Sequence, residues 1–208
     1  MKLKKLVALV SSAILAFSLV GCSIEGEENG ASSDGSLVGN GSIGFSVSTL
    51  NNPFFVTLSQ GAKDKAKEEG RDLIVVDAGD DAAKQTSDIE DLISKNISIL
   101  IVNPVDSDAV APAVKDAIAK GIKVISLDRA VNGVDVDCSI ASDNVEGAKM
   151  ATEYLVSLVG KDAKVVELEG TSGSSATIDR GAGFHKIADD QLNVVSSQTA
   201  NFNRSEGM

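Results

Sequence analysis

From residue 42 onward, short apolar runs alternate with segments whose apolar residues recur at helical spacing. The apolar runs predict strands at residues 43–47, 73–77, 97–102, 122–127 and 136–141. Residues 54–70 predict an amphipathic helix. Its apolar face consists of Phe55, Leu58, Ala62 and Ala66. The strands begin about every 25 to 30 residues with one helix between them, as in right-handed βαβ units. The pattern therefore predicts an α/β fold with a doubly wound parallel sheet.

Turn and capping residues mark the ends of the predicted helices. Gly70 and Asn96 suit the left-handed conformation that often ends a helix. Asp106 or Ser107 is expected to cap the third helix, which should end at Gly121.

The alternation continues beyond the fifth predicted strand. The expected elements are a helix at residues 145–159, a strand at 164–169, a helix that carries Arg180, and a strand at 193–198. Asp143 is interpreted as the N-cap of the first of these helices, because Glu146 follows it at the spacing of a capping box.

Polar residues follow each predicted strand of the parallel sheet. They are residues 48–52, Asp77, Asn103, Asp128 with Arg129, and residues 142–144. Ligands of such sheets bind beyond the carboxyl ends of the strands, so these residues predict a polar site. Each has a structural alternative: Asp128 suits a turn, Arg129 a surface cation, and Phe54 with Phe55 the packing of a core helix.

The chemistry of these side chains matches a small polyol. A carboxylate accepts hydrogen bonds, a guanidinium donates them and an amide does both, which suits neighbouring hydroxyl groups. Phenyl rings pack against the C–H faces of a sugar ring and exclude water. The chain has six Phe, one Tyr and no Trp, and Phe54 and Phe55 adjoin the polar strand ends.

The negative charge of the chain argues against polyanions as its binding partners. A formal net charge of −11 and a pI near 4.5 disfavour nucleic acid and anionic membrane surfaces, which proteins bind through Lys and Arg. The expected partners therefore do not include nucleic acid, and the membrane enters only through an anchor.

The N-terminus has the pattern of an export signal. Lys2, Lys4 and Lys5 precede an apolar run at residues 6–20, which is short for a membrane span. The run ends in LVGC, which resembles the lipobox of bacterial lipoproteins and implies cleavage after residue 21 and lipidation of Cys22. The alternative is an ordinary thiol beside an ordinary cleavage site.

The segment after the signal is rich in Gly, Ser, Glu and Asn. Residues 22–41 therefore predict a flexible tether between a membrane and a folded domain. The second cysteine, Cys138, is expected to be a small buried apolar residue and not a nucleophile.

Several ordered motifs resemble the ribose-binding proteins of bacterial ABC importers, in the periplasmic sugar-binding superfamily. The motifs are STLNNPFF at residues 48–55, NPVDSDAV at 103–110, LDR at 127–129, IASDN at 140–144 and GTSGSSATIDRGAGF at 170–184. The resemblance runs from residue 42 to the end. Thr171 and Ile178 depart from the residues more usual in the last motif.

This resemblance implies a role for each matching residue. Those expected to hydrogen-bond sugar hydroxyl groups are Asn52, Asp128, Arg129 and Arg180. Those expected to sandwich the ring are Phe54, Phe55 and Phe202. Asn103 and Asn144 are expected at or next to the pocket.

The resemblance also implies two lobes that close on a monosaccharide, with D-ribose as the first candidate. Residues 42–142 correspond to the N-terminal sugar-binding lobe, and residues 143–208 to the start of a second, C-terminally truncated lobe. The expected partner is the permease of an ABC importer, outside the cytoplasm and beside the membrane that holds the lipid anchor. No cofactor and no metal is expected.

Other function classes remain open at this point. An enzyme would have to be built on His185, the one histidine, and no HExxH or paired CxxC motif accompanies it. The loop at residues 170–176 lacks the Lys of a P-loop. A LacI-type regulator shares the fold but not the export signal. A sugar-sensing lipoprotein for chemotaxis or a sensor kinase, or a non-functional fragment, would share every motif above.

Overall fold

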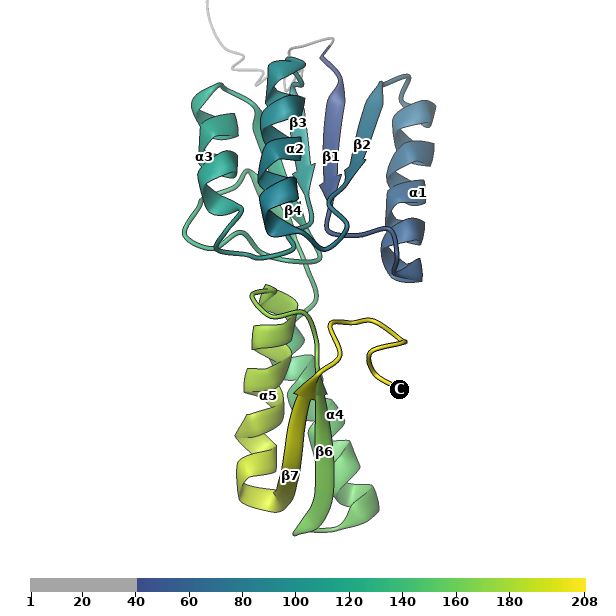
Figure 1. The fold of residues 1–208 in the computed structure, drawn as a ribbon, viewed down its shortest axis with the longest axis vertical. Coiled ribbons are helices and arrows are strands. Elements are labelled where there is room, and N and C mark those ends of the chain that lie inside the picture. The colour runs from purple at the N-terminus through teal and green to yellow at the C-terminus, as the bar shows by residue number, and fades with distance from the viewer. Residues whose placement is uncertain (1–40) are drawn as a thin grey trace, which may run out of the picture. The chain divides into compact units, whose positions relative to one another are not determined.

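The computed structural model describes residues 41–208 (Figure 1). The predicted export signal, the predicted lipidation site at Cys22 and all but the last residue of the predicted tether lie outside the described residues. The described part of the chain contains two separate parallel sheets, one of five strands and one of two.

The larger sheet has the strand order β2-β1-β3-β4-β5, with every neighbouring pair parallel. Its strands are β1 Ile43–Val47, β2 Leu73–Asp77, β3 Ile99–Val102, β4 Lys123–Leu127 and β5 Cys138–Ile140. The predicted doubly wound α/β fold is confirmed. The chain runs outward from β1 in one direction to β2 and in the other to β3, so the strand order reverses at β1. A ligand crevice is expected beyond the carboxyl ends of the strands at that point.

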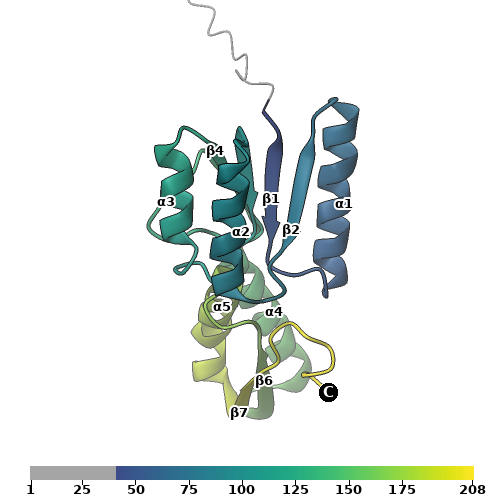
Figure 2. The same cartoon turned by 45° about the horizontal axis from the view of Figure 1, so that its top comes forward.

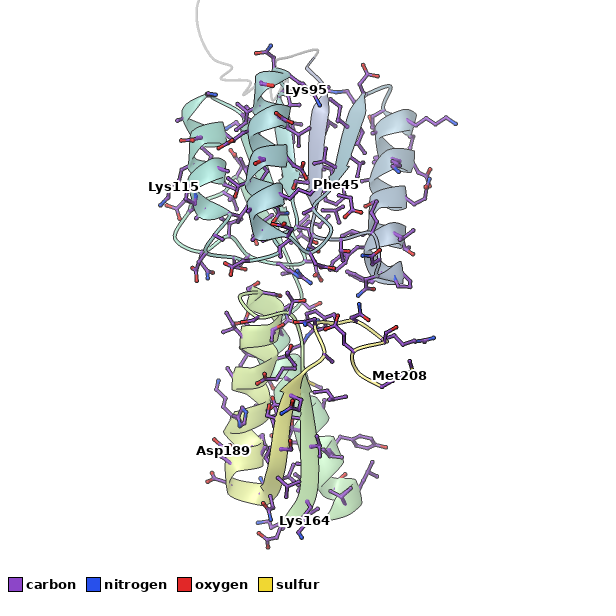
Figure 3. All side chains as sticks on the ribbon, viewed as in Figure 1. Phe45, Lys95, Lys115, Lys164, Asp189 and Met208 are labelled. Carbon is purple, nitrogen blue, oxygen red and sulfur yellow. The ribbon has the colours of Figure 1, made fainter. Side chains whose placement is uncertain are left out.

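Helices cover both faces of this sheet. They are α1 Pro53–Glu68, α2 Ala82–Ser94 and α3 Ala111–Ala119. The buried side chains of α2 and α3 form one core with β3 and β4, and the two helices lie side by side in Figure 1 and Figure 2. On the other face, Phe55 from α1 packs with Phe45 and Val47 of β1, and Phe45 is labelled in Figure 3.

The ends of α1 and α2 follow from their capping residues. Oδ1 of Asn52 accepts a hydrogen bond of 3.0 Å from the Phe54 N–H, and Pro53 takes the first helical position. After α1, Gly70 has a φ of 63°, and after α2, Asn96 has a φ of 56°. Both predicted left-handed helix ends are therefore confirmed.

The predicted cap of the third helix is wrong by one turn. Oδ1 of Asp106 accepts hydrogen bonds from the N–H groups of Asp108 and Ala109, at 2.9 and 2.8 Å. These bonds cap a turn at residues 107–110 that leads into α3. The helix itself begins only at Ala111, with no side-chain cap in the described part of the chain. Pro112 explains why α3 begins at Ala111 and not earlier. A proline has no N–H to donate, and only in the first turn of a helix does this cost no hydrogen bond.

The smaller sheet pairs two parallel strands with two helices. The elements are α4 Asn144–Val159, β6 Ala163–Glu169, α5 Ser175–Gln191 and β7 Leu192–Thr199. Oδ1 of Asp143 accepts a hydrogen bond of 2.9 Å from the Glu146 N–H, so the predicted cap of α4 is confirmed. Helices α4 and α5 pack on each other, and α5 also contacts β6 and β7.

The prediction that Cys138 is buried is wrong. The apolar segment at residues 136–141 forms only the short strand β5, which is the last strand of the larger sheet. All three of its residues are exposed, including Cys138. An edge strand pairs on one side only, and its side chains depend on neighbouring elements for cover.

His185 lies on α5 between two carboxylates. Its Nδ1 is 2.8 Å from Oδ1 of Asp189, which Figure 3 labels, and its Nε2 is 3.2 Å from Oε2 of Glu167. The hydrogen bond with Asp189 raises the pKa of His185 above its ordinary value, and the negative charge of Glu167 adds to this shift. The protonated imidazole is therefore favoured in the folded chain.

Raising the pH from about 6 to about 8 is expected to lower the melting temperature by about 1 to 3 °C. A histidine with a raised pKa contributes stability that is complete below the unfolded value of about 6.5 and is lost as the pH rises through the folded value. Thermal unfolding followed by circular dichroism measures this decrease. His185→Gln should remove it, because the chain has one histidine. An equal decrease in the variant would contradict the assignment.

Candidate functional site

The loop after β1 is fixed by polar side chains at the ends of the neighbouring strands. Oδ1 of Asp77, at the end of β2, accepts a hydrogen bond of 3.1 Å from the Leu50 N–H. Oδ1 of Asn103, after β3, accepts from the N–H and the hydroxyl of Ser48, at 3.2 and 2.6 Å. These bonds hold the start of α1 at the point where the strand order reverses.

Arg129 follows β4 and is buried, with 2% of its side chain exposed. Its Nη1 donates a hydrogen bond of 2.8 Å to the Pro104 carbonyl, whereas its Nε has no hydrogen-bond partner among the described residues. The guanidinium lies 5.0 Å from the ring centroid of Phe55 and 5.6 Å from that of Phe202. A charged donor that is buried without a partner is costly, so this nitrogen is suited to a ligand oxygen.

Asp128 precedes this arginine and has an unusual backbone. Its φ is 67°, a conformation that Asp and Asn tolerate better than most residues. Burial raises the pKa of Asp128, and the positive charges of Arg129 and Arg180 oppose that shift. Its carboxylate Oδ2 lies 3.9 Å from Nε of Arg129, too far for a hydrogen bond. The carboxylate of Asp128 and Nε of Arg129 therefore lie side by side, and both can still form a hydrogen bond with a ligand.

Phe202 comes from the segment after β7 and closes over the same region. Its φ is 53°, and its ring lies where a side chain on Gly170 would stand. Arg180 of α5 lies 5.7 Å from the centroid of this ring. A glycine at position 170 is therefore required for Phe202 to adopt this position.

A cavity of about 280 Å³ lies among these side chains. It is lined by Asn52, Phe54, Phe55, Asp128, Arg129, Ser142, Ala176, Arg180 and Phe202. The structure thus brings together seven of the nine residues predicted for the site. This volume lies just below the range of small-molecule sites, which runs from about 300 to 1,000 Å³, and fits a ligand of few heavy atoms.

Two of the predicted site residues, Asn103 and Asn144, do not line this cavity. Asn103 is fully buried and gives its Nδ2 hydrogen to the Leu127 carbonyl at 3.0 Å, besides accepting from Ser48. Asn144 accepts a hydrogen bond of 2.9 Å from Nε of Arg180. Asn103 therefore ties the strand ends together, and Asn144 orients an arginine that does line the cavity.

Two lining residues were not predicted as site residues. Ser142 follows β5 and belongs to the polar strand ends, so its place directly after a strand is a signal for binding. Ala176 lies in the first turn of α5, and an alanine near a helix start carries no sequence signal for binding.

A larger cavity of about 630 Å³ adjoins α4, β6 and α5 and shares Ser142, Arg180 and Phe202 with the smaller one. Its remaining wall includes the apolar side chains of Val166 and Leu168. The smaller cavity is the better candidate site, because the buried guanidinium, the carboxylate and the aromatic rings converge there.

Fold and site together define a binding protein of the periplasmic type. Residues 43–207 match the family described as the periplasmic binding protein domain. The chain belongs to this family, whose members bind substrates for transport and which is not an enzyme family. The description of the family as periplasmic indicates a location outside the cytoplasm. None of the helices among residues 41–208 is long and apolar enough to traverse a bilayer.

Among its relatives is the ribose import binding protein RbsB of Bacillus subtilis (strain 168), which is 46% identical over 206 residues. The alignment covers 99% of this chain and 67% of that protein. The protein of the same name from Escherichia coli (strain K12) is 41% identical over 209 residues, with 100% and 66% covered. The chain thus spans about two thirds of the length of these relatives.

Solved structures with the same fold include a separate binding protein and a periplasmic domain of a two component system. The crystal structure of a Caulobacter myo-inositol binding protein bound to myo-inositol matches with a TM-score of 0.75 and 31% identity, covering 81% of this chain and 58% of that one. The fructose binding periplasmic domain of the hybrid two component system BT1754 matches with a TM-score of 0.74 and 25% identity, covering 79% and 55%.

Proposed function

We propose that this chain binds a small neutral sugar, with D-ribose as the first candidate, and delivers it to the permease of an ABC importer. The observation that carries this proposal is the buried Nε of Arg129, which has no partner among the described residues and adjoins a cavity lined by Asp128 and aromatic rings. Both of the relatives described above are ribose import binding proteins, which supports ribose as the sugar.

The proposed roles follow from the chemistry of each side chain. Arg129 and Arg180 donate to sugar hydroxyl groups, Asp128 accepts from them, and the amide of Asn52 can do both. Phe54 and Phe55 pack against one face of the ring and Phe202 against the other. A hydrogen bond to a charged group contributes about 1.5 to 3 kcal/mol. Micromolar affinity needs about 8 kcal/mol after the cost of association, so three or four such bonds would have to act together with the packing of the rings.

The proposal extends to the setting of the protein. Residues 42–142 form the first sugar-binding lobe and residues 143–208 belong to a second, and the sugar is bound between them. Cys22 carries the lipid that holds the chain at the outer face of a membrane, with residues 22–41 as the tether. The match to an extracytoplasmic family and the lipobox-like LVGC support this arrangement.

Isothermal titration calorimetry on the purified 208-residue chain tests the binding function. D-ribose is expected to give a saturable heat with one site and a dissociation constant in the micromolar range or below. myo-Inositol and D-fructose, titrated in the same way, report how far the site discriminates among polyols. No heat with any of the three at millimolar concentration would refute sugar binding by this chain.

A second candidate is a sugar-sensing lipoprotein that presents its ligand to a receptor. The similarity to a periplasmic domain of a two-component system supports it. The two candidates share the sugar site and differ in the partner. Deleting the coding sequence and measuring uptake of labelled ribose separates them: lost uptake supports the importer, whereas intact uptake with a lost transcriptional response to ribose supports the sensor.

Asp128→Asn is expected to weaken sugar binding by about 10- to 100-fold, because one charge-assisted hydrogen bond is replaced by a neutral one. The same change is expected to raise the free energy of unfolding of the ligand-free chain. Burial raises the pKa of Asp128, so its ionised form costs stability at neutral pH, and that cost disappears as the pH falls through the raised value. Asparagine also tolerates the positive φ.

Calorimetry with D-ribose and urea unfolding of the two proteins measure these opposite effects. Asp143→Asn, at a helix cap outside the 280 Å³ cavity, is the matched control and should leave sugar affinity unchanged. Unchanged affinity in Asp128→Asn would contradict the role proposed for this carboxylate.

A further inference from the structure

The loop between β6 and α5 makes hydrogen bonds with two loops of the larger sheet. The Ser175 N–H donates to Oγ of Ser107 at 3.0 Å, and the Ser107 N–H donates to the Gly173 carbonyl at 2.9 Å. The Ala130 N–H donates to Oγ of Ser175 at 2.8 Å. Ser107 follows β3 and Ala130 follows β4, so three hydrogen bonds join the start of α5 to the carboxyl ends of two strands.

This contact is buried and closely fitted. Ser107 is fully buried and Ser175 is 9% exposed. Gly173 has a φ of 80°, and a Cβ on it would overlap the carboxylate of Asp106. The glycine is therefore required both by its backbone conformation and by the approach of Asp106.

None of the bonded residues is among those that line the 280 Å³ cavity, but Ser175 and Ala130 are each next in the chain to a residue that does. Ala176 and Arg180 line the cavity from α5, one and five positions after Ser175. Arg129, next to Ala130, lines it from the loop after β4. The three bonds thus hold two walls of the cavity in register without themselves facing its contents.

We propose that Ser107 and Ser175 are positioning residues for sugar binding, which hold α5 and the loop after β4 together through contacts that no ligand supplies. This inference rests on the function proposed above. The affinity of a ligand is reduced by the fraction of molecules in which the binding arrangement is formed, so contacts that favour this arrangement raise affinity without touching the sugar. They also slow dissociation, because the walls must separate before the sugar leaves.

Ser175→Ala and Ser107→Ala are each expected to weaken ribose binding about two- to tenfold, since each removes one acceptor of a buried hydrogen bond. The dissociation rate should rise by a similar factor. Ser175→Thr keeps the hydroxyl and should restore most of the affinity. Ser174→Ala is the matched control: its Oγ is buried and has no hydrogen-bond partner within residues 41–208, so its removal should leave affinity unchanged.

Hydrogen–deuterium exchange on the ligand-free chain measures the contact independently of sugar. The N–H groups of Ser107, Ala130 and Ser175 are expected to exchange slowly in the original protein and in Ser174→Ala. In Ser175→Ala the Ala130 amide, and in Ser107→Ala the Ser175 amide, should exchange at least several-fold faster. If neither the original chain nor any variant binds ribose, the proposed function is refuted, but the exchange rates still test the contact between Ser107, Ala130 and Ser175. Equal exchange in all variants, or equal loss of affinity in Ser174→Ala, would overturn the positioning role.

Discussion

Replacing Arg129 with methionine is expected to weaken ribose binding by at least about a hundredfold. Methionine keeps the length and much of the volume of the side chain between the rings of Phe55 and Phe202. It lacks every donor, so at least two charge-assisted hydrogen bonds of about 1.5 to 3 kcal/mol each are lost. Calorimetry with D-ribose measures the loss.

The free energy of unfolding of Arg129→Met shows whether a loss of ribose binding comes from the site or from unfolding of the chain. Arg129→Met leaves the Pro104 carbonyl without its donor and also removes a buried charge, and these changes oppose each other. Arg129→Lys keeps the charge but not the planar fork, and should bind ribose more weakly than the original chain and more tightly than Arg129→Met. Ribose affinity within about tenfold of that of the original chain, in a folded Arg129→Met, would contradict the role proposed for Arg129.

Replacing Phe55 with alanine is expected to lower the free energy of unfolding by about 3 to 5 kcal/mol, besides weakening ribose binding. Phe55 is 3% exposed, packs with Phe45 and Val47, and supports the guanidinium of Arg129. Its removal leaves a void under α1 that the neighbouring side chains fill only in part. Urea unfolding followed by circular dichroism measures the change.

Phe54→Ala is the matched control for this prediction. The two rings are adjacent, with centroids 5.2 Å apart, but Phe54 is 53% exposed. Its replacement should change the free energy of unfolding by no more than about 0.5 kcal/mol while still weakening ribose binding. Equal destabilisation by the two changes would show that the division of roles between these rings is wrong.

The α/β fold could be predicted because its strands are near-continuous apolar runs separated by capped amphipathic helices. The polar residues that follow β1, β2, β3 and β4 do gather at one edge, as parallel strands require. The sequence did not show which of them face outward. Asn103 and Asp128 both follow strands, yet the first bonds only within the protein and the second lines the cavity.

Errors arose where distant parts of the chain decide the environment of a residue. Cys138 lies in an apolar run, but its exposure depends on what packs beside an edge strand. The alternative that Arg129 is a surface cation is excluded by its burial, which depends on Phe55 from α1 and Phe202 from beyond β7. The hydrogen bonds of Ser107 and Ser175 join residues 68 positions apart, and the pattern of neither segment indicates the other.

The most direct test of the proposed site is a crystal structure of this chain grown with D-ribose. The sugar is expected between the Phe54–Phe55 pair and Phe202, with one hydroxyl oxygen about 2.7 to 3.2 Å from Nε of Arg129 and another hydroxyl donating to Asp128. Ribose bound elsewhere on the chain, with Nε of Arg129 still unpaired beside it, would contradict the account.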